Sequence, residues 1–168
     1  MNIFVLDNDP KVAAQMACDK HVVKMVLETA QMLSTVQHHN GITAPYKPTH
    51  ANHPCTKWAA TSTQNYKWLL EHGIALCEEY TYRYNKEHKC EQLITGPLSL
   101  IPILPTEKLT PFAQAMPEQH KRENAVDAYR QYYIHEKARF AKWKNRDIPT
   151  WFAEAVITTT EKIGRAHV

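Results

Sequence analysis

The spacing of apolar residues along the chain predicts a mainly helical protein. Apolar side chains recur every three or four positions over residues 18–33 and again over residues 55–88. This is the periodicity of a helix that buries one face. A third stripe of the same period predicts a helix over residues 123–144, with Val126, Tyr129, Tyr133, Lys137 and Phe140 along one side.

Start signals divide the first part of the chain into two helical stretches. Asp9 followed by Pro10 is typical of an N-cap with proline in the first turn, which predicts a short helix ending at Ala17. Asp19 is a candidate N-cap for a second helix that runs to about Gln37, unless the two stretches form one bent helix. Gly73 either divides the long stretch over residues 55–88 or marks a close contact between helices.

Two irregular segments separate these stretches. Residues 38–53 contain a glycine and two prolines, and residues 96–117 contain five prolines. Such composition predicts long loops. The expected architecture is therefore a compact single-domain bundle of about three long helices with long proline-rich loops. We expect it over residues 1–152, with a partly disordered tail over residues 153–168.

Composition narrows the class of protein further. Charged residues make up 22% of the 168 residues and apolar residues 43%, as in ordinary globular domains. The net charge is only +3, but residues 121–146 hold eight Lys or Arg against three acids, which indicates one positive surface. The four cysteines form no C-x-x-C pair, and no apolar run reaches about 18 residues. We therefore expect a cytoplasmic monomer with reduced thiols that needs no membrane, metal or cofactor.

One carboxylate is out of place in this pattern. Glu28 follows His21 by seven residues, close to two helical turns, so both share a face with Met25 and Met32. A carboxylate in an apolar stripe is costly unless something compensates its charge. Glu28 is then either an ordinary helix glutamate, paired to a lysine or facing solvent, or a catalytic carboxylate with His21 beside it in a pocket near the N-terminus.

Two further groups of residues have open interpretations. His50, His53 and Cys55 offer metal-binding side chains, but their spacing matches no established zinc site, so a polar loop or a phosphate contact from His53 is favoured. The basic segment 121–146 is interleaved with aromatic residues. It is either a phosphate-binding surface with aromatic platforms or an amphipathic helix with a solvated basic side.

The stretch Asp19-Lys20-His21 followed by Glu28 is similar to the first long helix of the phage pyrimidine-dimer DNA glycosylases, the endonuclease V family. Downstream, Ala138-Arg139-Phe140 and Pro149-Thr150-Trp151-Phe152 resemble a later helix of that family and the aromatic motif that follows it. These similarities are collinear over roughly residues 15 to 152.

The resemblance implies a mechanism in which a free N-terminal amine attacks the anomeric carbon of a deoxyribose. An α-amine with a pKa of about 7.7–8.0 is partly neutral at physiological pH, so such a group can act as a nucleophile. The family's first residue is threonine after methionine removal, whereas here the bulky Asn2 leaves Met1 in place. Met1 would therefore supply the amine, Glu28 would stabilise the cationic sugar, and His21 would orient phosphate or substrate.

The chain also departs from the family at the residues that bind DNA. Family arginines correspond to Leu27, to Gln31 and, near the N-terminus, to Asn2 or Ile3, while Lys20 and Lys24 flank the same helix. The substrate-binding residues that we expect are Asn2, Lys20, Lys24, Gln31, His53, Arg130, Lys137, Arg139 and Trp151.

The predicted function is therefore a DNA N-glycosylase with lyase activity that acts on damaged or modified DNA in a phage-infected host cell. One alternative is hydrolysis of the N-glycosidic bond of a free nucleotide or nucleoside, which would explain the missing arginines. Another is a non-catalytic DNA-binding or inhibitory protein built on the same helices.

Overall fold

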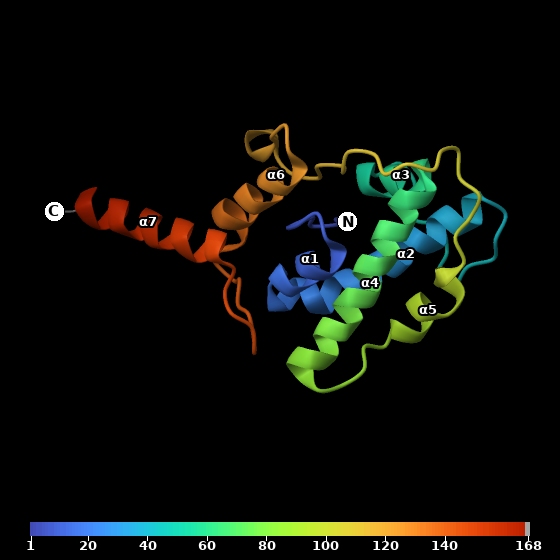
Figure 1. Ribbon diagram of the computed structural model, residues 1–168, viewed down its shortest axis with the longest axis horizontal. Helices are drawn as coiled ribbons and strands as arrows, with labels where there is room; N and C mark the ends of the chain where they lie inside the picture. Colours follow the sequence, from blue (N-terminus) through green and yellow to red (C-terminus); the bar gives the residue numbers. More distant parts are fainter. Residues whose placement is uncertain (167–168) are drawn as a thin grey trace.

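The computed structural model describes the backbone of residues 1–166 and side chains as far as Thr158, and it is dominated by helices (Figure 1). The α-helices are α1 (Pro10–Met16), α2 (Asp19–His39), α3 (Pro54–Thr61), α4 (Thr63–Tyr84), α5 (Glu91–Thr95), α6 (Ala125–Tyr132) and α7 (Thr150–Ala166). Within this part of the chain, β pairing is limited to an isolated bridge between Ser62 and Thr106. The predicted mainly α fold is confirmed.

The first N-terminal helix starts where the sequence predicts, and the second starts one residue earlier, with Cys18 and not Asp19 at its N-cap. The Asp9 side chain accepts hydrogen bonds from the amides of Lys11 and Val12, so it caps α1, and Pro10 is the first residue of that helix. The chain then turns at Ala17 and Cys18, both in extended conformation, before α2 begins at Asp19. The two stretches are therefore separate helices.

The long stretch over residues 55–88 divides at Ser62, not at Gly73. Ser62 has an extended conformation, and its hydroxyl accepts a hydrogen bond from the Asn65 amide, which caps α4. Gly73 lies inside α4, where a Cβ atom would come within 2.9 Å of the Thr29 methyl carbon on α2. Gly73 therefore marks the close contact of α2 with α4.

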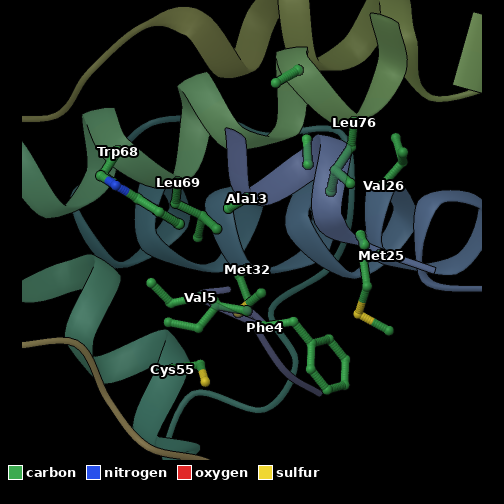
Figure 2. Packing of buried hydrophobic residues seen from close by; sticks show 14 of the residues in the cluster. Phe4, Val5, Ala13, Met25, Val26, Met32, Cys55, Trp68, Leu69 and Leu76 are labelled. Atoms are coloured by element: carbon green, nitrogen blue, oxygen red, sulfur yellow. The ribbon is translucent and has the colours of Figure 1, made fainter. Parts of the chain in front are cut away.

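The first six residues run through the interior of the protein. Residues 3–6 are all buried, and Figure 2 shows Phe4 and Val5 packed near Met32 of α2 and Cys55 of α3. In Figure 1 the N-terminus accordingly lies in the middle of the molecule, among α1, α2, α3 and α6. Burial of this apolar segment carries the terminal amine to the flank of α2.

The predicted third helix over residues 123–144 is wrong in its second half. Helix α6 ends at Tyr132, a π-helical turn follows over Tyr133–Lys137, and the chain then becomes irregular up to α7. Tertiary hydrogen bonds hold this segment away from a helical path, because Asp19 bonds the backbone of residues 142 and 144 and the Trp143 indole donates to the Met16 carbonyl.

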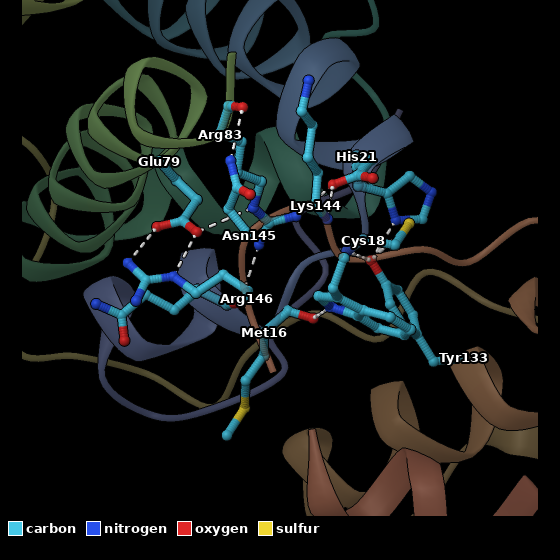
Figure 3. A network of polar contacts seen from close by, with 12 residues as sticks. Met16, Cys18, His21, Glu79, Arg83, Tyr133, Lys144, Asn145 and Arg146 are labelled. Atoms are coloured by element: carbon cyan, nitrogen blue, oxygen red, sulfur yellow. Dashed lines mark hydrogen bonds and ion pairs between the residues drawn. The ribbon is translucent and has the colours of Figure 1, made fainter. Parts of the chain in front are cut away.

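An ion-pair network completes this attachment (Figure 3). The fully buried Arg83 on α4 pairs with Asp19 at 3.0 Å and with Glu79 at 2.9 Å. Arg146 donates two further hydrogen bonds to the Glu79 carboxylate, at 2.8 and 3.0 Å. Because each charge has a partner, the network can be buried at the junction of α2, α4 and the irregular segment.

The C-terminal segment is helical where the sequence suggested a tail. Helix α7 continues to Ala166, and the last two residues of the expected tail lie outside the described part of the chain. Figure 1 shows α7 extending away from the other helices. None of the described helices is long and apolar enough to cross a membrane.

Candidate active site

The N-terminal amine and Glu28 form the centre of the candidate site. The Met1 nitrogen lies 3.2 Å from Oε1 of Glu28, and Glu28 is only 9% exposed. Among the described residues no hydrogen bond of good geometry is made to Oε1 of Glu28, so the contact between the Met1 amine and this oxygen is an ion pair. The amine thus supplies the positive charge that a carboxylate in an apolar stripe requires.

His21 lies away from this pair. Its ring stacks on Phe4 with 4.0 Å between ring centroids, and its Nδ1 atom forms a short hydrogen bond with the Tyr133 hydroxyl. Burial lowers the pKa of His21 to about 3, with help from nearby lysines, so the imidazole is neutral at physiological pH. The His21 ring is therefore held by aromatic side chains, two helical turns before Glu28 on α2.

A cavity of about 600 Å³ opens beside His21, and we call it the lysine cavity. It is lined by Asp19, Lys20, His21, Val23, Lys24, Tyr84, Lys137 and Phe140. The Lys20 ammonium lies 4.6 Å from the Phe140 ring centroid, and the Lys137 ammonium lies 4.6 Å from that of Tyr132. Three lysines against one aspartate make this cavity suitable for phosphate groups.

Four positions of α2 share the exposed side of the helix on which two of the cavity lysines lie. Lys20, Lys24 and Leu27 are exposed and Gln31 is half-buried, at spacings that place them on one side of the helix. Glu28 is adjacent to Leu27 in the chain, and Lys24 precedes Glu28 by one helical turn. The exposed side of α2 that carries Lys20 and Lys24 is therefore next to the face that carries Glu28.

His53 also belongs to this site. Its Nδ1 atom accepts a hydrogen bond from the Cys55 amide at 3.1 Å, so His53 is the N-cap of α3. Burial lowers the pKa of His53, and the positive N-terminal amine lowers it further, while Glu28 acts in the opposite direction. The loop before α3 thus places this imidazole within the electrostatic field of the amine and the carboxylate.

Asn2 faces the interior and not a DNA-binding surface. Its side-chain amide donates to the Ala115 carbonyl at 2.8 Å, and its Oδ1 atom accepts from the amides of Ile3 and Phe4. Asn2 is 8% exposed, because the terminal segment carries it into the core. These contacts replace the substrate contact that we expected from the sequence.

Arg130 and Trp151 lie at a different place from the lysine cavity. The Arg130 guanidinium donates to the Leu6 carbonyl at 2.9 Å and to Asp7 at 3.4 Å, and it stacks on the Trp151 ring. Both residues line a separate cavity of about 880 Å³ between α6 and α7. Arg130 thus holds the N-terminal segment, whereas Arg139 is exposed and lies next to Phe140.

Sequence reasoning missed the residues that hold the site in place. Phe4, Tyr129 and Tyr133 have only the apolar and aromatic spacing of core residues, yet they contact His21 and the backbone of residues 113–115.

The metal-binding side chains that the sequence offered are not grouped into a metal site. Burial raises the pKa of the Cys55 thiol to about 12, so it is protonated at physiological pH. Among the described residues, no group of three or more His, Cys, Asp or Glu side chains is arranged to hold a metal ion.

The fold and the site together define a helical protein whose terminal amine faces a buried carboxylate on α2, the helix that also lines a basic cavity. The family model described as pyrimidine dimer DNA glycosylase matches residues 1–92. The match covers more than half of the chain, so this protein belongs to the pyrimidine dimer DNA glycosylase family. At the level of the family it is a DNA glycosylase.

The matched residues contain the amine, His21, Glu28 and His53, while Lys137 and Phe140 lie beyond them. No curated protein and no solved structure matches the chain.

Proposed function

We propose that this protein is a DNA N-glycosylase with abasic-site lyase activity, in which the Met1 amine is the nucleophile and Glu28 is its acid–base partner. The observation that carries the proposal is the distance of 3.2 Å between the amine nitrogen and Glu28 Oε1. This distance is within the reach that proton transfer requires. The contact joins two groups 27 positions apart in the chain, and both lie in the segment that matches the family.

The proposed reaction begins when the neutral amine attacks C1′ of a deoxyribose. The C1′–N bond to the base breaks, and the base leaves with a proton lost by the attacking amine. The C1′–O4′ bond then breaks, O4′ takes up a proton, and the electron pair of the Met1 nitrogen forms the second bond to C1′, which gives an iminium ion. The Glu28 carboxylate stabilises positive charge as it develops on the sugar. Removal of a C2′ proton then expels the 3′ phosphate, which cuts the strand, and water releases the enzyme.

The position of the amine supports use of the retained Met1. If Met1 were removed, the new terminus would be the Asn2 nitrogen, one residue further from Glu28. Asn2 is held in place by hydrogen bonds to Ala115 and to its own neighbours, so it could not move forward without losing them. The contact with Glu28 therefore depends on the initiator methionine.

The lysine cavity is the proposed contact for the DNA backbone. Lys20, Lys24 and Lys137 supply positive charge on the side of α2 that leads to Glu28. The neutral His21 offers a hydrogen bond to a phosphate oxygen without adding charge. Gln31 and Arg139 are further proposed contacts of this surface. His53 is a proposed contact close to the Met1 amine, whose charge acts on its pKa.

Borohydride trapping on a duplex with one abasic site tests the proposal. Borohydride reduces the iminium ion to a stable amine, so the wild-type protein should become covalently joined to DNA, and peptide mapping should place the adduct on Met1. Protein acetylated at its N-terminus should give no adduct. An adduct on a lysine would contradict the role of Met1.

Two control measurements separate this proposal from the alternatives. Absence of an adduct together with release of base from free nucleosides would favour a nucleoside hydrolase. Absence of both, with salt-sensitive DNA binding retained, would favour a non-catalytic DNA-binding protein.

A further inference from the structure

We infer that Asn2 is a positioning residue, whose side chain fixes the first residues of the chain so that the Met1 amine stays at Glu28. The inference rests on the proposed function, because it concerns the nucleophile of that reaction. It assigns Asn2 a role inside the protein in place of a contact with DNA.

The Asn2 side chain uses both of its polar ends at once. Its Oδ1 atom accepts hydrogen bonds from the amides of Ile3 at 2.7 Å and Phe4 at 3.0 Å. Its Nδ2 atom donates to the Ala115 carbonyl at 2.8 Å. The first pair of bonds closes a local turn directly behind Met1, and the third joins that turn to a distant part of the chain.

The distant anchor is itself fixed. The Ala115 amide donates to the Tyr129 hydroxyl at 3.2 Å, and that hydroxyl donates to the Ala113 carbonyl at 2.6 Å. Tyr129 is fully buried on α6. Asn2 therefore connects the terminal turn to a side chain of the core, through the backbone of residues 113–115.

A second anchor from α6 holds the other end of the same segment. Arg130 donates to the Leu6 carbonyl at 2.9 Å, so the segment over residues 2–6 is attached at both ends. Chain termini are usually poorly ordered unless they are tied down in this way. Among residues 1–6, Met1 alone precedes the two attachment points, which are Asn2 and Leu6. Asn2 therefore determines the direction in which the Met1 amine points.

The chemistry of asparagine fits this position better than that of its nearest analogues. Aspartate retains the two acceptor bonds but has no donor, so it would set a carboxylate against the Ala115 carbonyl. Leucine has the same number and branching of side-chain heavy atoms, although its methyl groups are bulkier, and it has neither function. A small residue such as serine would also favour removal of Met1, which would take away the amine that reaches Glu28.

The role of a positioning residue predicts a particular kinetic result. An amine that is free to swing spends less time within reach of the sugar carbon, so the rate of the covalent step falls while DNA affinity does not. For Asn2→Leu we expect the trapping rate at saturating abasic DNA to fall about tenfold or more, the factor that corresponds to one lost buried hydrogen bond or more. The DNA dissociation constant should stay within about twofold of wild type.

A matched control is available six residues along the chain. Asn8 is exposed, so Asn8→Leu makes the same chemical change without breaking the turn, and it should behave as wild type. Asn2→Asp keeps the bonds to Ile3 and Phe4, so its trapping rate should lie between those of wild type and Asn2→Leu. If Asn2→Leu fails to fold, as judged by circular dichroism, Asn2→Asp decides the question.

A second measurement tests Asn2 without any DNA. Limiting acetic anhydride should acetylate Met1 slowly in wild type and in Asn8→Leu, and about tenfold faster in Asn2→Leu, as followed by peptide mapping. Failure of wild type to trap DNA would sink the proposed function, while this acylation result would still test Asn2. Wild-type acylation and trapping rates in Asn2→Leu would overturn the inference.

Discussion

Replacing Glu28 with glutamine should nearly abolish trapping and strand cleavage while the protein stays folded. The substitution keeps the size of the side chain but removes the charge that lies 3.2 Å from the Met1 amine. The amine then loses its proton acceptor, and the cationic sugar loses the carboxylate that would stabilise it. Both effects act on the transition state, so the rate should fall much more than DNA binding.

The expected loss is about 100- to 10,000-fold in the rate of the covalent step, the range for a positioned acid–base group. The cost in stability is smaller. A hydrogen bond or contact to a charged group contributes about 1.5–3 kcal/mol. For a domain of this size that corresponds to a fall in Tm of roughly 3–12 °C, so the variant should remain folded at 25 °C.

Single-turnover borohydride trapping on abasic duplex DNA, with circular dichroism for folding, measures both quantities. Glu71→Gln is the matched control, because Glu71 is a half-exposed glutamate on α4 that pairs with Lys67 at 4.0 Å and lies outside the candidate site. It should trap at the wild-type rate. A Glu28→Gln rate within about threefold of wild type would refute the assignment of Glu28 as the acid–base partner.

Four other predictions follow from the same structure. Changing all three lysines of the lysine cavity to glutamine should reduce the log–log salt slope of duplex binding by about 0.9 per lost phosphate contact, and an unchanged slope would place the DNA elsewhere. Burial lowers the pKa of His21 to about 3 and that of His72 to about 4, so the unfolded chain binds more protons than the folded one below pH 6.5. Each histidine should therefore lower the free energy of unfolding by about 2 kcal/mol between pH 7.5 and pH 5. The urea midpoint of His72→Gln should accordingly vary less with pH than that of wild type. Gly73→Ala should lower the free energy of unfolding by about 1–3 kcal/mol, because the new Cβ atom would lie 2.9 Å from the Thr29 methyl carbon. Thr29→Ser removes that methyl group, so a thermal melt of the double variant should show most of the lost stability recovered. Because Leu27 offers no hydrogen bond where the family has an arginine, excision of a thymine dimer should be slower than cleavage at an abasic site, and equal rates in parallel duplexes would show that this arginine is dispensable here.

Local sequence signals predicted the elements that depend on nearby residues. The Asp9-Pro10 pair predicted the start of α1, and the apolar period placed Glu28 on the same face as Met25 and Met32 but left open whether its side chain is buried or faces solvent. The boundary at Ser62 was missed, because a serine N-cap inside an apolar pattern looks like any other polar position. The end of α6 was missed for a different reason, since its period continues past Tyr132 while bonds from Asp19 hold the following segment off a helical path.

The sequence by itself determined the helical class, the excess of positive charge and the presence of a carboxylate that needs a partner. Only the tertiary structure decided which cation that partner is, because the amine reaches Glu28 across 27 positions through burial of residues 3–6. The inward direction of Asn2 was decided in the same way, by a carbonyl 113 positions away. Helical periodicity reports which face of an element is buried, whereas the group that meets that face depends on how the whole chain packs.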